Sequence, residues 1–245
     1  MICPETSHRP WELPSRPWAL AMRWHDLLFM HWPMPGEALR ASIPPSLAID
    51  TFDGTAWIGV TPFRMAGVRP RALPPLPWFS AFPELNVRTY VTAAEKPGVW
   101  FFSLDAANRL MVRLARLVFH LPYYDARMSS QRSGDVVHYT SERTDRGAPA
   151  AAFRGRFRPI GPVSYASPGT LEHWLTERYC LYTTDQHGRV WRGDIHHARW
   201  PLQPAGAEVS VNTMTHQLGL ALPDRAPLLH FARRLDVVGW TLERV

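Results

Sequence analysis

The chain of 245 residues is 46% hydrophobic and holds 11 Trp, which excludes a disordered protein and allows one large domain with a sizeable core. Its net charge of +6 comes from one lysine and otherwise from arginines spread along the whole chain, so we do not expect a nucleic-acid partner. No apolar run reaches the roughly 18 residues of a membrane span, no apolar leader begins the chain and two cysteines are too few for a disulfide framework, so we expect a cytoplasmic protein without a membrane partner.

The order of predicted elements indicates a mainly β protein of the α+β class. Residues 1–17 are polar and Pro-rich, which predicts a loosely attached N-terminal arm, and residues 18–245 contain no repeat or linker, so we expect one domain there. About ten strands with turns at regular spacing and two or three helices are typical of an antiparallel β-barrel or sandwich with insertions. Strands are expected, among others, over residues 24–32, 135–142, 152–158, 179–182 and 189–192.

Residues 82–128 combine a strand, a turn, a second strand and a helix. Polar side chains at 84, 86, 88 and 90 alternate with less polar ones, which predicts a strand with two unlike faces. Residues 95–98 are typical of a turn, and the apolar residues 99–104 predict the second strand of a hairpin. Asp105 is expected to cap the helix and Pro122 to end it. The apolar positions with helical spacing are Leu110, Met111, Leu114, Ala115 and Val118.

The polar face of the first of these strands holds Glu84, Asn86 and Arg88, which project the same way about 7 Å apart. If this face meets solvent, the three are ordinary surface groups. If it lines the interior of a barrel, a carboxylate and a guanidinium share a low-dielectric cavity, where each perturbs the pKa of the other. The alternation favours the exposed face and leaves the interior face open.

Further arginines and tyrosines are candidates for binding an organic anion. One stripe of the predicted helix holds three arginines, which is typical of a solvated helix face. Tyr123 and Tyr124 follow the helix, where a phenol can pack as a cap or enter a pocket. Arginine side chains inside a cavity suit a carboxylate because they form bidentate contacts with it. The stripe consists of Arg109, Arg113 and Arg116, and the other candidate arginines are Arg143 and Arg178.

Motifs for other kinds of chemistry are missing from the sequence. His25 and His31 are six residues apart, His196 and His197 are adjacent, and His138 is isolated, so their spacing does not predict a metal site. We find no Gly-rich phosphate loop, no Gly-x-Ser-x-Gly elbow and no Cys–His pairing. We therefore expect no cofactor, no metal and no catalytic triad.

A series of segments in fixed order resembles the YqjF-like family of bacterial proteins, a domain of unknown function (2071). The resemblance covers roughly residues 23–240 and implies little about activity, because the family has no established one. The segments are LRASIPPSLAIDTFDGTAWIGVTPFRM, ELNVRTYV, KPGVWFFSLDA, ARLVFHLPYYDARM, GTLEHWLTERYCLY and HHARWPLQPA.

More distantly, the chain is similar to proteins with the acetoacetate decarboxylase-like fold, which implies an antiparallel β-barrel with a central cavity. In those enzymes a strand carries a Glu, and a later segment ends in Gly-Phe-Pro-Lys-Lys. The resemblance puts Glu84 at the first position and Tyr123 and Tyr124 at the two lysines. Tyrosine cannot form an imine, and Lys96 lies in the predicted turn, so we do not expect Schiff-base chemistry.

Two functions remain open from the sequence. The first is a protein that binds a small organic keto or carboxylate compound in the barrel, with Arg88 or Arg116 as the anion partner. An enzymatic version, of lyase or isomerase type, uses Glu84 as the acid or base and Tyr123 as a hydrogen-bond donor. The second is a binding or protein-interaction module that has lost catalysis. Whether the chain forms a homo-oligomer also stays open.

Overall fold

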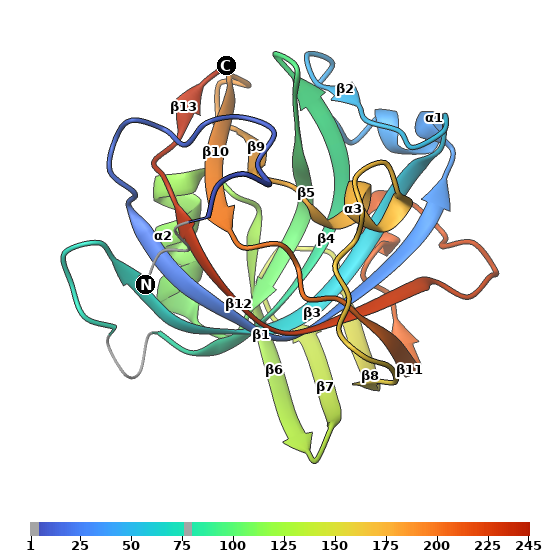
Figure 1. Ribbon diagram of the computed structural model, residues 1–245. Coiled ribbons are helices and arrows are strands. Elements are labelled where there is room, and N and C mark those ends of the chain that lie inside the picture. The colour runs from blue at the N-terminus through green and yellow to red at the C-terminus, as the bar shows by residue number, and fades with distance from the viewer. Residues whose placement is uncertain (1–4, 76–79) are drawn as a thin grey trace.

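The computed structural model describes residues 5–75 and 80–245. Within them, strands form one continuous network, and three α-helices and a short 3-10 helix lie between strands (Figure 1). The strands are β1 (Leu20–Met34), β2 (Ala48–Ile49), β3 (Ala56–Pro70), β4 (Phe82–Ala93), β5 (Lys96–Ala106), β6 (Tyr123–Ser133), β7 (Val136–Arg143), β8 (Ala152–Pro159), β9 (Cys180–Thr184), β10 (Val190–His197), β11 (Gln203–Asn212), β12 (Leu228–Gly239) and β13 (Glu243–Arg244). The helices are α1 (Gly36–Arg40), α2 (Arg109–Phe119), α3 (Leu171–Thr176) and η1 (His216–Leu218).

The strand network closes on itself, which confirms the predicted β-barrel. Nine strands form a ring in the order β5-β6-β7-β8-β11-β12-β1-β3-β4, which the β4–β5 pairing closes. Strands β9 and β10 bridge β5 and β12 and so complete a second ring. Both rings share the wall β12-β1-β3-β4-β5. This shared wall is covered on both faces, so its strands bury side chains in both directions.

Side chains along the shared wall point alternately into two hydrophobic cores, one on each face of the wall. On β4, Leu85, Val87 and Val91 join the core cluster that contains Tyr139 and Phe153 of β7 and β8. The opposite face of β4 begins with Phe82, which packs in the core cluster that contains Phe63, Leu104 and Trp200. Glu84, Asn86, Arg88 and Tyr90 alternate with the first set and therefore share this second face.

The hairpin of β4 and β5 confirms the prediction, with its turn shifted toward the N-terminus. Ala93 pairs with Lys96, so Ala94 and Glu95 alone form the turn, with φ of 46° and 59°. Positive φ at both central residues is the geometry that continues the twist of the two strands. Gly98 belongs to β5, and an added Cβ there would lie 2.7 Å from the Cys180 sulfur, so glycine lets β9 pass close by.

Helix α2 begins at a different residue from the prediction. Its cap is Asn108, whose side chain accepts a hydrogen bond from the Met111 amide (3.2 Å), while Asp105 lies within β5. Of its apolar side chains, Leu110, Leu114 and Val118 are exposed, whereas Val112 is buried.

Two ion pairs connect α2 to later parts of the chain. Arg113 binds Asp125 at 2.6 Å and Arg116 binds Asp145 at 2.5 Å. Arg109 and Arg113 are nevertheless exposed and Arg116 is half-buried, so the expected solvated arginine face is largely present. The helix ends at Phe119, because His120 adopts a left-handed conformation (φ 50°) just before Pro122.

The described part of the N-terminal arm packs on β10, contrary to the expected loose attachment. Arg9 is buried and donates to the main-chain oxygen of Ile195 (2.6 Å), and the Trp11 indole donates to Asp194 (3.1 Å). The first four residues of the predicted arm lie outside the described residues. Among the helices of the described ranges, none is long and apolar enough to cross a membrane.

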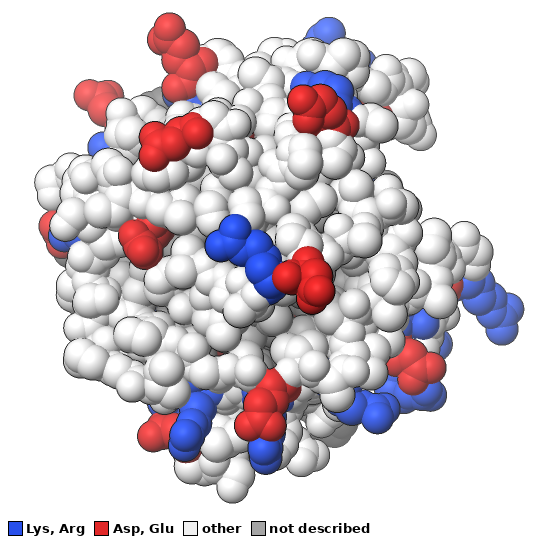
Figure 2. Space-filling model, turned by 90° about the vertical axis from the view of Figure 1, so that its right-hand side faces the viewer, with Lys and Arg blue, Asp and Glu red and all other residues white. Residues whose placement is uncertain are grey.

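Charges are mixed on the face of the molecule in Figure 2. Acidic and basic side chains lie beside one another there, with wide uncharged areas between them. The described basic residues on this face do not gather into a continuous basic patch, which is the kind of surface that attracts polyanions.

Candidate functional site

Glu84 and Tyr123 form a buried hydrogen-bonded pair on the second face of the shared wall. Glu84 is 2% exposed, so the solvent-exposed face that the alternation favoured is wrong for this residue, which lies in the interior. The Tyr123 hydroxyl donates to Glu84 Oε2 at 3.0 Å. The two residues come from β4 and β6, at opposite sides of β5, and the register explains why they meet. Leu104 of β5 pairs with Asn86 on one side and with Tyr123 on the other.

Burial controls the protonation of this pair. Burial raises the pKa of Glu84 to about 8, against the hydrogen bond from Tyr123, which lowers it, and with the charge of Asp105, which raises it. Burial and the neighbouring Glu84 raise the pKa of Tyr123 well above its ordinary value. Near neutral pH the pair therefore consists of a neutral carboxyl group and a neutral phenol.

The two tyrosines at the start of β6 face opposite ways. Tyr123 reaches Glu84, and its main-chain oxygen accepts a hydrogen bond from Arg116 Nε (2.7 Å), which fixes the strand start to α2. Tyr124 lies on the other face, where the Arg143 guanidinium carbon is 4.1 Å from its ring centroid. Only Tyr123 of the two can therefore contact a group bound beside Glu84.

Arg88 lies at the other end of the polar face of β4, about 13 Å along the strand from Glu84. Its guanidinium carbon is 5.0 Å from the Phe29 ring centroid and 5.9 Å from that of Tyr90. Its Nε is buried and has no hydrogen-bond partner among the described residues. Across residues 5–75 and 80–245, no carboxylate lies within ion-pair distance of Arg88, although most interior arginines in this chain have one.

Three further polar atoms near Arg88 are buried without a partner in the described part of the chain. They are Asn86 Oδ1, Thr61 Oγ1 and His31 Nδ1. Thr61 pairs with Asn86 across β3 and β4, and Gly59 pairs with Arg88 on one side and His31 on the other, so all lie on neighbouring positions of one face. A buried polar atom without a partner costs about 1–3 kcal/mol, so this face is suited to a ligand that supplies the missing bonds.

Arg178 approaches the Arg88 end of the face through Tyr90. Its guanidinium carbon is 4.8 Å from the Tyr90 ring centroid, and its Nη1 binds Asp50 at 2.5 Å. Its Nη2 is buried and unpartnered in the described structure. Arg178 is thus neutralised by Asp50 and lies beside the site, whereas Arg88 retains an uncompensated charge.

The two other predicted arginines lie elsewhere. Arg143 forms a buried pair with Asp105 (2.6 and 3.0 Å) on the opposite face of the wall, facing the core of the nine-stranded ring. Arg116 binds Asp145 beside α2. Glu84, Asn86, Arg88 and Tyr123 are therefore brought together on one face, with Arg178 at its edge, and Arg116 and Arg143 are not.

Four residues of this face, His31, Gly59, Thr61 and Tyr90, were not predicted as site residues from the sequence. His31 Nε2 lies 2.7 Å from the Tyr90 hydroxyl. Tyr90 continues the alternation of Glu84, Asn86 and Arg88, so this alternation could have predicted it as part of the site. Thr61 lies on β3, which pairs with β4, and His31 lies on β1, which pairs with β3. The spacing of these residues in the sequence does not indicate that they meet the polar face of β4.

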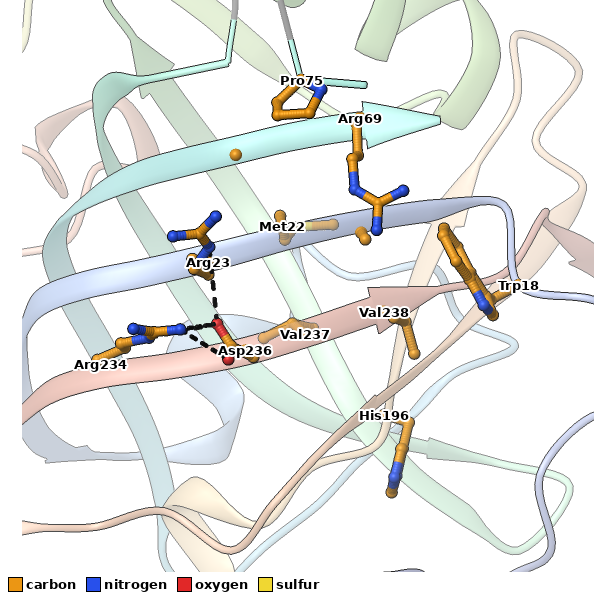
Figure 3. A pocket seen from close by; sticks show the side chains of 12 residues that line it. Trp18, Met22, Arg23, Arg69, Pro75, His196, Arg234, Asp236, Val237 and Val238 are labelled. Atoms are coloured by element: carbon orange, nitrogen blue, oxygen red, sulfur yellow. Dashed lines mark hydrogen bonds and ion pairs between the residues drawn. The ribbon is translucent and has the colours of Figure 1, made fainter. Parts of the chain in front are cut away.

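A separate hollow of about 460 Å³ lies beside the first part of β1, the end of β3 and β12 (Figure 3). Arg23 and Arg234 both turn toward Asp236 there, and the Arg234–Asp236 distance is 3.0 Å. None of the residues predicted for the site lines this hollow. In the described ranges, no group of three His, Cys, Asp or Glu side chains is arranged to hold a metal ion.

Comparison with known proteins places the chain in a family and gives its fold relatives. The model of the DUF2071 family, described as an uncharacterized conserved protein, matches residues 21–236. The uncharacterized protein YqjF of Bacillus subtilis (strain 168) is 47% identical over 232 residues, which is 95% of each chain.

Solved structures of low sequence identity share the fold. The enduracididine biosynthesis enzyme MppR in complex with pyruvate has a TM-score of 0.64 at 9% identity, over 94% of this chain and 91% of that one. Acetoacetate decarboxylase from Legionella pneumophila has a TM-score of 0.64 at 12% identity, over 96% and 91%. The expected acetoacetate decarboxylase-like fold is confirmed, and the chain belongs to the YqjF-like DUF2071 family of uncharacterized proteins.

Proposed function

We propose that this protein binds a small organic keto or carboxylate compound against the polar face of β4, with Arg88 as the anion partner. The observation that carries the proposal is the uncompensated charge of Arg88 on a face that also holds unpartnered buried polar atoms. A partly buried guanidinium without a counter-charge is costly, and a carboxylate supplies both the charge and two hydrogen bonds.

The lining of the face agrees with a small organic ligand. Phe29 lies under the Arg88 guanidinium, and Phe63 and Leu104 belong to the core cluster on the same side of the wall. Apolar walls with a few placed polar groups are the usual composition of small-molecule sites. MppR, which shares the fold, is described in complex with pyruvate, a compound of this class.

The proposed binding is not covalent. Tyr123 and Tyr124 stand at the positions of the two decarboxylase lysines, and a phenol forms no imine. The one lysine, Lys96, is in the β4–β5 hairpin with its Nζ 5.5 Å from the Trp11 ring centroid. We also propose the cytoplasm as its compartment, since Cys180 is a buried free thiol and suits a reducing environment.

Calorimetric titration with pyruvate and phenylpyruvate tests the binding. We expect Arg88→Gln to lose about 10–100-fold in affinity, because a charged hydrogen-bonded contact contributes about 1.5–3 kcal/mol. Arg154→Gln is the matched control, since Arg154 is an exposed arginine of β8. Equal affinity in Arg88→Gln and wild type, or no binding of either acid to the wild type, would reject the proposal.

A second candidate is a lyase- or isomerase-type enzyme that uses Glu84 as its acid or base. The observation that favours it is the buried Glu84–Tyr123 pair, in which the carboxyl group has a pKa near working pH. Glu84→Gln and Tyr123→Phe should then lower turnover of a bound acid by about 10²–10⁴-fold while leaving its affinity nearly unchanged. Binding without turnover in the wild type leaves the non-enzymatic function.

A further inference from the structure

One face of the shared wall carries four arginines and a histidine, where the first part of β1 lies between β3 and β12. Side chains that pair across antiparallel strands lie on the same face. The alternate positions, such as Met65 and Leu235, pack in the core cluster that contains Phe63 and Trp200, so this face is turned away from that core. We name it the basic face, and it consists of Ala21, Arg23 and His25 of β1, Arg64, Ala66 and Arg69 of β3, and Arg234, Asp236 and Val238 of β12.

Positive charge exceeds negative charge on the basic face. Asp236 is its one carboxylate, and Arg23 (3.8 Å) and Arg234 (3.0 Å) share it. No carboxylate of the described ranges lies within ion-pair distance of Arg64 or Arg69. Four guanidinium groups with one carboxylate leave three positive charges, and Arg23 and Arg234 are exposed to an anion that arrives from solvent.

The hollow of Figure 3 lies on this face. Its volume is about 460 Å³, and Arg23, Arg69 and Arg234 line it from three strands. Sites for small molecules have volumes of about 300–1,000 Å³. Gly67 leaves room for the Arg23 side chain, because an added Cβ would lie 3.1 Å from Arg23 Nη2. Trp18 lies at one end of the hollow, and the Arg69 guanidinium carbon is 5.4 Å from its ring centroid, so an aromatic ring holds this arginine in place.

His25 lies in the middle of the excess charge. It pairs with Arg234 of β12 on one side and with Arg64 of β3 on the other. Burial lowers the pKa of His25, and the charge of Arg64 lowers it further. Arg234 and Arg23 act in the same direction, against Asp26, which raises this pKa. Like charges that face each other across strands are destabilising, so an anion bound here relieves repulsion within the fold.

A tetrahedral dianion suits this face better than a carboxylate does. A carboxylate carries one charge and two oxygens, which match the fork of a single guanidinium group. A phosphate group carries nearly two charges and three acceptor oxygens, so it can accept from several arginines at once. Arg23, Arg69 and Arg234 come from β1, β3 and β12 and line the same hollow, as such a contact requires.

We propose that the hollow binds a small organic phosphate, with the phosphate group among Arg23, Arg69 and Arg234. This site is separate from Arg88 on β4, and the proposal does not depend on the binding of a carboxylate there. The organic part of the ligand packs on the apolar residues of the lining. They are Trp18, Ala21, Met22, Pro75, Val237 and Val238.

Calorimetric titration with phenyl phosphate tests the proposal. We expect Arg69→Gln and Arg234→Gln each to weaken binding on the order of tenfold, because each removes a charge-assisted hydrogen bond. Arg154→Gln is the matched control, since Arg154 is an exposed arginine of β8, and it should keep the wild-type affinity. No binding to the wild type, or equal affinity in all four proteins, would overturn the proposal.

Asp236→Asn tests the sign of the charge effect. The substitution removes the one carboxylate of the face, while the amide oxygen still accepts hydrogen bonds from the arginines. We expect phenyl phosphate to bind about 2–5-fold more tightly, the size of effect that exposed charge pairs produce. Weaker binding in this variant would contradict a site that selects its ligand by negative charge.

Sulfate gives a second readout, because it is a tetrahedral dianion that keeps its charge over the range in which histidines titrate. Saturating sulfate should raise the pKa of His25, since added negative charge stabilises the imidazolium form. By linkage, sulfate then binds more tightly as the pH falls through that pKa, and His25→Gln should remove this dependence. NMR titration of His25 with and without sulfate measures the shift, and an unchanged pKa would place the anion elsewhere and overturn the proposal.

Two controls define the ligand and the site. Saturating phenylpyruvate should not displace phenyl phosphate, and displacement would overturn a separate site. Vesicles of phosphatidylcholine and phosphatidic acid should not bind the protein, and binding of these vesicles without binding of phenyl phosphate would overturn a small-molecule ligand. If phenyl phosphate binds and phenylpyruvate does not, the phosphate site stands and the proposed carboxylate function fails. The reverse result rejects the phosphate site and leaves the carboxylate function.

Discussion

At the scale of single residues, the site depends on a small number of buried groups whose protonation is set by their surroundings. Glu84 is removed from water on every side, with Tyr123 on its carboxyl group and Tyr139 donating to its main-chain oxygen (2.7 Å). A neutral carboxyl group there does not repel an anion held at Arg88. The same burial makes Glu84 costly to the fold at alkaline pH.

We predict that the stability of the wild type falls relative to Glu84→Gln as the pH rises. The folded protein keeps the Glu84 proton up to about pH 8, whereas the unfolded chain loses it near pH 4.5. The folded state therefore binds more protons in this window, and the cost accumulates between those two pH values to on the order of 5 kcal/mol. Urea unfolding of both proteins at pH 5, 6.5 and 8 measures the difference, and a difference that does not change with pH would contradict the burial argument.

At the scale of elements, side-chain pairs that cross between strands and helices decide which face is turned inward. Asp105 of β5 and Arg143 of β7 lie on either side of β6 and are both almost fully buried. Arg143 also donates to the Gln217 side chain. The Asp105–Arg143 pair therefore links β5 to β7 across β6.

Breaking this pair should destabilise the protein strongly. Arg143→Met leaves the Asp105 carboxylate buried without a counter-charge, and we expect a loss of about 3–5 kcal/mol of unfolding free energy. Adding Asp105→Asn should restore a large part of it, because no buried charge then remains. Thermal and urea unfolding of the single and double variants measure both effects. A loss below about 1 kcal/mol in Arg143→Met would show that the pair is not needed.

Elements were predictable from the sequence wherever the signal is local. The alternation of β4, the hairpin to β5 and the end of α2 before Pro122 all follow from neighbouring residues. The ion pairs of α2 were not predictable, because Asp125 and Asp145 come later in the chain and are not marked by spacing. The start of β6 at Tyr123 was missed for a related reason, since its partner is a parallel stretch of β5.

At the scale of the whole molecule, two rings of strands share one wall, and this arrangement explains why the polar face of β4 is buried. The sequence alternation left open whether that face meets water. Strands β9 and β10, which complete the second ring, decide the question, and their pairing with β5 and β12 connects residues far apart in the chain. Arg88, His31 and Thr61 are also brought together by strand pairing, of β4 with β3 and of β3 with β1.

The proposed ligand site on the interior face of β4 is separate from the hollow beside Trp18 and Asp236 in Figure 3. The hollow has arginines that Asp236 partly neutralises, whereas Arg88 has no carboxylate partner among the described residues. Of these two places, the interior face is the one where, among the described residues, an arginine without a carboxylate partner lies beside buried polar atoms without hydrogen-bond partners. We therefore expect a carboxylate ligand to occupy the interior face of β4 rather than the hollow.

A crystal structure of the protein with phenylpyruvate tests the central claim most directly. We predict the carboxylate oxygens about 2.7–3.0 Å from the Arg88 guanidinium. A ligand found only in the hollow beside Trp18, or on the face that holds Asp105 and Arg143, would contradict the account.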